Sequence, residues 1–103
     1  MSTPLPAPLR LPVVAAPMFL ISGPDLVIAA CTSGVVGAFP APNCRTADEL
    51  DEWMGTITTS LDAARATDPD GVAPWALNLV THRTNTRLEA DLELVAKHRP
   101  PIV

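Results

Sequence analysis

The feature that most constrains the fold is a regular alternation of short apolar runs with longer amphipathic segments. Four runs are continuously apolar and show no strict polar alternation, which is typical of strands buried on both faces of a parallel sheet. A segment with helical signals fills each gap, and this alternation predicts an α/β fold with right-handed crossovers. The expected strands are residues 12–16 (PVVAA), 35–39 (VVGAF), 75–79 (WALNL) and 101–103 (PIV).

Local signals predict where the first two helices begin and end. The first helix is expected to start within residues 22–25 (SGPD), which combine capping residues with a proline for the first turn. It is expected to stop near Gly34, because glycine readily adopts the left-handed conformation that ends helices. The second helix starts with the capping box Thr46-x-x-Glu49 and ends at the turn over residues 67–71 (TDPDG).

A third helix is expected to start near Asn85 or Thr86, with Glu89 completing a second capping box. Its helical spacing predicts a buried stripe made of Leu88, Leu92 and Val95. A charged helix face is usually solvated, so the following side chains are expected to face solvent: Arg87, Glu89, Asp91, Glu93 and Lys97.

The chain of 103 residues is long enough for about three and a half βα units, because its last residues start a fourth strand. A short strand at an open apolar edge is a poor domain boundary, since it invites self-pairing. The number of residues per βα unit also matches a (β/α)₈ barrel, which uses about 250 residues for its eight units. We therefore expect residues 12–103 to be the N-terminal part of a TIM barrel, truncated in its fourth strand, after an extended arm over residues 1–11.

Composition argues against several classes of protein. The formal net charge is −4 and no cluster of Lys or Arg is present, which argues against nucleic-acid binding. No apolar run reaches the ~18–20 residues of a membrane span, and the N-terminus lacks the regions of a secretory signal. We therefore expect a cytoplasmic protein. Cys31 is expected in a helix core, and Cys44 is expected to be a neutral loop residue, with a reactive thiol as the alternative.

Candidate ligand-binding residues follow the strands, because parallel α/β proteins bind ligands at the carboxyl ends of their strands. The segments 16–19 and 40–43 are unusually apolar for loops, and apolar walls with a few amides suit a flavin. Met18 either packs on a ring ligand or fills the mouth of the barrel. Asn78, expected inside an apolar strand, either pairs with neighbouring backbone or faces a ligand.

Other polar residues near the strand ends carry weaker signals. Arg83 suits a carboxylate or phosphate, and His82 suits a base or hydrogen-bond donor, with a structural or solvated loop residue as the alternative for His82. Asn43 and Asn85 are expected to be turn or cap residues. The sequence contains no glycine-rich nucleotide-binding motif, nucleophile motif or metal-ligand spacing, so no metal is expected.

Three of these segments together resemble the N-terminal third of the nitronate monooxygenases, formerly called 2-nitropropane dioxygenases. They are APMF at residues 16–19, GVVGAFPAPN at residues 34–43, and the group Asn78, Leu79, Arg83 and Asn85. The resemblance covers nearly the whole chain after Leu11. It implies a TIM barrel that carries FMN and oxidises alkyl nitronates or nitroalkanes with molecular oxygen.

The same resemblance implies that Ala16, Pro17, Met18 and Asn78 contact FMN, mainly through backbone groups and the amide. It also implies that the catalytic histidine and the phosphate-binding glycines follow Val103, so the catalytic residues are unknown and the chain alone is expected to be inactive. Two alternatives remain. One is a related flavin barrel that uses NAD(P)H, such as an enoyl reductase or dehydrogenase, and the other is a non-enzymatic, self-associating βα module.

Overall fold

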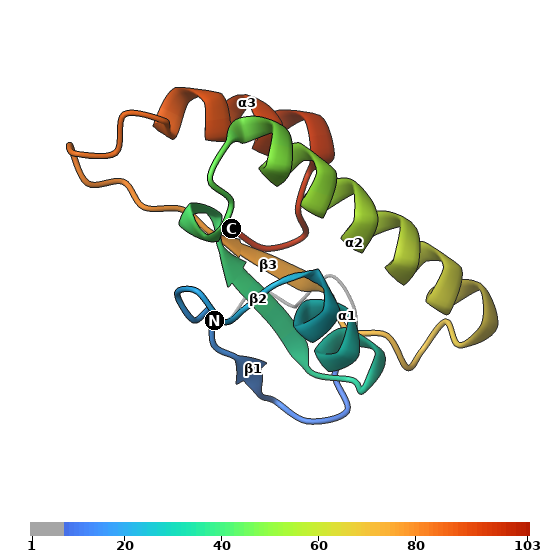
Figure 1. The fold of residues 1–103 in the computed structure, drawn as a ribbon. Helices are drawn as coiled ribbons and strands as arrows, with labels where there is room; N and C mark the ends of the chain where they lie inside the picture. Colours follow the sequence, from blue (N-terminus) through green and yellow to red (C-terminus); the bar gives the residue numbers. More distant parts are fainter. Residues whose placement is uncertain (1–7) are drawn as a thin grey trace, which may run out of the picture.

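A computed structural model describes residues 8–103, and its strands and helices follow one another in the expected order (Figure 1). Residues 1–7 of the expected N-terminal arm lie outside the described residues. The strands are β1 (Val14–Ala15), β2 (Val36–Pro40) and β3 (Trp75–Asn78). The helices are α1 (Pro24–Thr32), the short 3₁₀ helix η1 (Ala41–Asn43), α2 (Ala47–Thr67) and α3 (Leu88–His98).

The three strands form one parallel sheet with the order β1-β2-β3, which confirms the expected α/β class. Gly37 in the central strand pairs with Trp75, and Pro40 pairs with Asn78. Beyond β3, Ile102 forms a parallel bridge with Ala76, and its carbonyl accepts a hydrogen bond of 3.0 Å from the Leu77 N–H. The expected fourth strand is therefore represented by one bridge, at the edge of the sheet next to β3.

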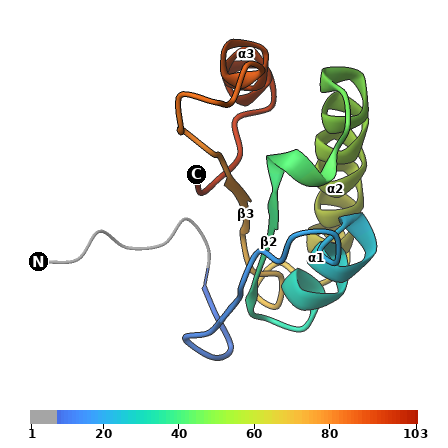
Figure 2. The ribbon, with the colours of Figure 1, turned by 60° about the vertical axis from the view of Figure 1, so that its left-hand side comes forward.

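The helices gather on one side of the sheet. Helices α1 and α2 cover the same face, and α3 lies beside α2 (Figures 1 and 2). Within residues 8–103, no helix covers the opposite face of the sheet (Figure 2). None of the helices in this part of the chain is long and apolar enough to cross a bilayer.

The core lies between β2, β3 and the first two helices. The fully buried Phe39 meets Trp53 edge-to-face, with ring centroids 5.5 Å apart, and stacks on Trp75 at 6.2 Å. Gly37 allows α1 to approach β2 closely, because a Cβ at this position would lie only 2.5 Å from the Val27 carbonyl oxygen. The strand therefore needs both its large aromatic residue and its glycine to dock against the helices.

The ends of α1 and α2 follow the sequence signals closely. Gly23 is the N-cap of α1, and Gly34 after the helix adopts a φ of +93°. Thr46 caps α2, since its Oγ1 accepts a hydrogen bond of 3.1 Å from the Glu49 N–H. The Glu49 carboxylate accepts from the Arg45 N–H at 3.3 Å and not from Thr46, so only one half of the predicted box has its usual partner.

The predicted start of α3 is wrong. The helix begins at Leu88, and its N-cap residue Arg87 makes no side-chain capping bond, so Thr86 and Glu89 do not form a capping box. The Asn85 side chain instead accepts a hydrogen bond of 3.0 Å from the Arg87 N–H, which holds a turn before the helix. A local asparagine turn therefore replaces the first turn of helix that the pattern predicted.

The predicted buried stripe of α3 is also wrong in part. Leu92 is 48% exposed, whereas Asp91, expected to face solvent, is only 2% exposed. Leu94 and Val95 pack against the core cluster. The helix therefore turns a face containing Asp91, Leu94 and Val95 inward. This rotation is possible because the Asp91 carboxylate has an arginine partner, and a buried charge needs one.

Candidate functional site

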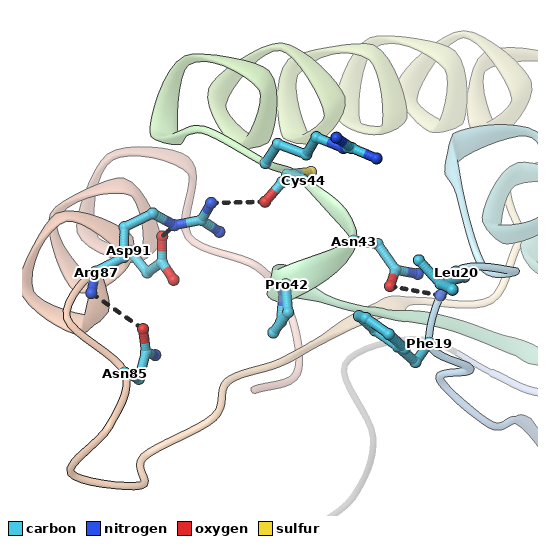
Figure 3. Close-up of a pocket in the computed structure, with 9 residues that line it drawn as sticks. Phe19, Leu20, Pro42, Asn43, Cys44, Asn85, Arg87 and Asp91 are labelled. Carbon is cyan, nitrogen blue, oxygen red and sulfur yellow. Dashed lines mark hydrogen bonds and ion pairs between the residues drawn. The ribbon is translucent and has the colours of Figure 1, made fainter.

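An open pocket of about 470 Å³ lies at the carboxyl ends of the strands, where the loops after β1, β2 and β3 meet (Figure 3). Its size is within the range of ligand-binding pockets, about 300–1,000 Å³. Its position is the one at which parallel α/β proteins bind ligands. The lining residues are Phe19 and Leu20 from the first loop, Pro42, Asn43, Cys44 and Arg45 from the second, and Asn85, Arg87 and Asp91 from the third loop and α3.

The first wall of the pocket is a tight turn over residues 18–22, which we call the Met18 loop. The Met18 N–H donates to Ser22 Oγ at 2.8 Å, and the Met18 carbonyl accepts from the Ile21 and Ser22 N–H groups at 3.2 and 3.0 Å. Leu20 adopts a left-handed backbone conformation with a φ of +66°. The chain therefore leaves β1 through a compact, internally bonded turn that presents its apolar side chains outward.

Asn43 connects this loop to the end of β2. Its Oδ1 accepts a hydrogen bond of 2.8 Å from the Leu20 N–H (Figure 3). Its Nδ2 donates to the carbonyls of Met18 at 3.0 Å and Ser22 at 2.8 Å. The side chain was expected to act as a turn or cap residue, but the structure uses it to bond two neighbouring βα loops together.

The second wall is held by a partly buried ion pair. Arg87 Nε donates to Asp91 Oδ1 at 3.0 Å (Figure 3). The Asp91 side chain is buried, and the Arg87 side chain is 24% exposed. The same guanidinium donates to the Cys44 carbonyl at 2.6 Å and to the Ala41 carbonyl at 3.0 Å. Arg87 therefore ties α3 to the loop after β2.

The prediction that Arg87 and Asp91 face solvent is wrong, and both line the pocket. Their four-residue spacing places them on one helix face, which is the signal that would have revealed the pair. Backbone carbonyls after β2 supply the remaining partners of the guanidinium. These carbonyls are distant in sequence, so the spacing alone could indicate the pair but not its burial.

The two cysteines are buried free thiols. Burial, together with a smaller effect of the nearby Glu49 carboxylate, raises the pKa of Cys44 to about 12. Burial also raises the pKa of Cys31, which lies in α1 as expected. Because the thiolate is the reactive form, Cys44 forms part of the pocket wall as a neutral side chain.

The residues predicted to contact FMN lie near this pocket but do not line it. Ala16, Pro17 and Met18 follow β1 directly and are exposed. Asn78 lies in the apolar strand β3 as expected, but it is the last residue of the strand and is exposed, so its amide is not buried there. All four residues lie at the carboxyl edge of the sheet, and their contact with FMN stays a prediction.

His82 and Arg83 lie in the exposed loop between β3 and α3, outside the pocket lining. His82 Nδ1 accepts a hydrogen bond of 3.2 Å from the Thr84 N–H and lies 2.9 Å from Thr84 Oγ1. The ring therefore stabilises a local turn, which agrees with the structural alternative for this histidine.

In the described part of the chain, no three His, Cys, Asp or Glu side chains gather where they could hold a metal ion. No family model, curated protein or solved structure matches the chain.

Proposed function

We propose that the protein is a cytoplasmic, FMN-dependent oxidoreductase that oxidises alkyl nitronates with molecular oxygen, as nitronate monooxygenases do. The observation that carries the proposal is the convergence of three sequence segments on one pocket. Phe19, Asn43 and Asn85 belong to the three segments that resemble the family, and all three line the pocket. The loops after parallel strands meet at one edge of the sheet, and this edge is where parallel α/β proteins bind their ligands.

The arrangement of the strands supports the barrel part of the proposal. In the common doubly wound folds, an early strand returns to the other side of β1 and creates a switch point. Here β1, β2, β3 and the bridge at Ile102 follow one another in a single direction. The helices lie on one face of this sheet (Figure 2). A singly wound sheet with helices outside is the arrangement that closes into a barrel.

The pocket fits the ring system of FMN better than its phosphate. Phe19, Leu20 and Pro42 offer apolar surface for a flat ring, and Met18 presents an exposed side chain nearby. The charge of Arg87 is balanced by Asp91, so it is poorly suited to hold a phosphate. When bound, FMN would supply the redox chemistry by accepting an electron from the nitronate and passing it to oxygen.

The chain's own residues would bind and orient this group. Ala16, Pro17, Met18 and Asn78 are the proposed FMN contacts. Because the N–H and carbonyl of Met18 are already bonded inside the loop, we assign its contact to the thioether side chain. Phe19 and Leu20 would exclude water from the same side of the ring.

Purification of the protein as its gene encodes it tests the proposal. We expect flavin absorbance, recovery of that absorbance after FMN reconstitution, and oxygen consumption when an alkyl nitronate is added. A colourless protein that takes up no FMN would contradict the proposal.

The two alternatives give different results in the same preparation. Anaerobic flavin reduction by NAD(P)H, without reduction by nitronates, would assign the protein to the reductase or dehydrogenase barrels. The exposed edge of β1 favours the self-associating module as the second alternative. A flavin-free dimer that unfolds cooperatively would support it.

A further inference from the structure

The Met18 loop combines features that are costly for stability. Phe19, Leu20 and Ile21 are 63%, 79% and 68% exposed, although all three are large and apolar. Leu20 also holds a left-handed conformation, which is strained for a residue other than glycine. Exposed apolar side chains on a strained but well-bonded turn are typical of functional sites.

The bonds of Asn43 explain how this conformation is kept. A side-chain amide has one acceptor oxygen and two donor hydrogens. In Asn43 the oxygen accepts from Leu20, and the nitrogen donates to Met18 and Ser22, all within the same loop. Ser22 is 1% exposed and adds its own bond to the Met18 N–H. Neither a carboxylate nor an apolar side chain can replace this combination of one acceptor and two donors.

We propose that Asn43 is a positioning residue that locks the Met18 loop, so that Phe19 and Leu20 form an apolar wall of the pocket. The wall selects nitronates with an uncharged alkyl group over nitronates that carry a second, carboxylate group. The selectivity rests on the proposed function, whereas the lock is a property of this chain by itself.

The charges around the pocket support this preference. Arg87 is paired with Asp91, and the Asn43 and Asn85 amides are bonded to backbone groups. Arg45 also lines the pocket, but it is exposed, so solvent and salt weaken its attraction for a carboxylate. A carboxylate placed against Phe19 and Leu20 would gain no hydrogen-bond donor from these two side chains, whereas an alkyl group would bury apolar surface against them.

Limited proteolysis with chymotrypsin tests the lock, because this protease cleaves after Phe19 and Leu20 when the loop opens. We expect cleavage there to be roughly tenfold faster in Asn43→Ala and Asn43→Asp, since each variant loses two or more hydrogen bonds to the loop. Asn85→Asp is the matched control, because the Asn85 side chain bonds only to Val80 and Arg87.

Circular dichroism establishes that each variant remains folded before the cleavage rates are compared. Faster cleavage confined to the two Asn43 variants supports the lock. Equal rates in folded Asn43 variants and in the wild type would overturn it.

A substrate pair of equal chain length tests the wall. We expect kcat/KM of the FMN-loaded protein to be roughly tenfold higher for propyl-1-nitronate than for propionate 3-nitronate. Leu20→Asn removes the apolar side chain and keeps the turn, because asparagine tolerates the left-handed conformation. We expect the ratio of the two kcat/KM values to approach one in Leu20→Asn and to fall in Asn43→Ala.

The two experiments test the lock, the apolar wall and the proposed function separately. An unchanged ratio in an active Leu20→Asn variant would overturn the wall. A protein that takes up no FMN would overturn the proposed function and the substrate preference with it, while the cleavage rates would still decide the lock.

Discussion

Strands β1 and β2 have similar apolar sequences, but β2 is buried and β1 is largely exposed. All five residues of β2 are buried, whereas Val14 in β1 is 56% exposed. β2 has a strand on each side and helices packed on it, while β1 pairs only with β2 among residues 8–103. β1 is also two residues long, although five were predicted. The prediction of burial on both faces is therefore correct for β2 and wrong for β1.

This difference shows that an apolar run predicts where a strand lies but not how deeply it is buried. Burial depends on neighbours that the run itself does not encode. The edge of β1 is the surface at which a parallel strand would complete a barrel. In the proposed fold, the exposed Val14 of β1 would become buried in the same way as the residues of β2.

The largest expected effect comes from truncating one residue in each strand. Phe39→Ala should destabilise the protein by about 3–5 kcal/mol, because it removes a fully buried aromatic ring from β2. Val14→Ala should change the free energy of unfolding by less than about 0.5 kcal/mol in this chain. Urea unfolding of both variants measures the contrast, and similar losses would show that β1 is buried in solution.

The next largest effect concerns the ion pair that holds the end of β2. Arg87→Met should cost about 3 kcal/mol, the low end of the range for breaking a buried ion pair, because it leaves the Asp91 carboxylate without its cation. Arg87→Met combined with Asp91→Leu should recover much of this loss. Equilibrium unfolding of the single and double variants checks the coupling, and additive losses would contradict it.

A smaller effect is expected at the contact between β2 and α1. Gly37→Ala should cost about 1–3 kcal/mol, because the added methyl group would clash with the Val27 carbonyl. Gly55→Ala in α2 is the control, since its Cβ would meet no atom closer than 3.9 Å and alanine favours helix. Thermal unfolding should show a lower Tm than that of the wild type for Gly37→Ala and not for Gly55→Ala.

The smallest effect is a pH dependence in the helix layer, away from both strands. Hydrogen bonds from His98 and Lys97 lower the pKa of the Asp51 carboxyl in the folded chain. Its stabilising contribution is therefore complete above the unfolded pKa of about 3.9 and is lost as pH falls through the lower folded value. Asp51→Asn should remove this part of the pH dependence. Unfolding free energies of both proteins at pH values from about 6 to about 2 provide the check.

The order of the elements and the parallel sheet could be predicted because they depend on local patterns. Gly34 and Thr46 each act at one end of their own helix, and the structure has them in these roles. The start of α3 was not predictable in the same way. A capping box and an asparagine turn compete over residues 85–89, and contacts with the loop after β2 favour the turn.

The location of the candidate site could also be predicted, since the carboxyl ends of parallel strands share one edge. The long-range hydrogen bonds that hold its walls could not be predicted. Asn43 bonds to residues more than 20 positions away, and Arg87 bonds to carbonyls more than 40 positions away. Such bonds leave no periodic signal in the sequence, so only the folded structure shows that these side chains hold the pocket walls.

Titration of isotopically labelled protein with FMN, followed by nuclear magnetic resonance, tests most directly whether the carboxyl edge of the sheet binds a flavin. We expect the backbone amide signals of Ala16, Met18, Phe19 and Leu20, and those of Asn43 and Asn78, to shift together with one saturating curve. Signals from Asp70 and Gly71, in the loop that leads to the opposite end of β3, should stay in place and serve as an internal reference. Shifts confined to that opposite end, or no shifts at all, would contradict a flavin site at the carboxyl ends of the strands.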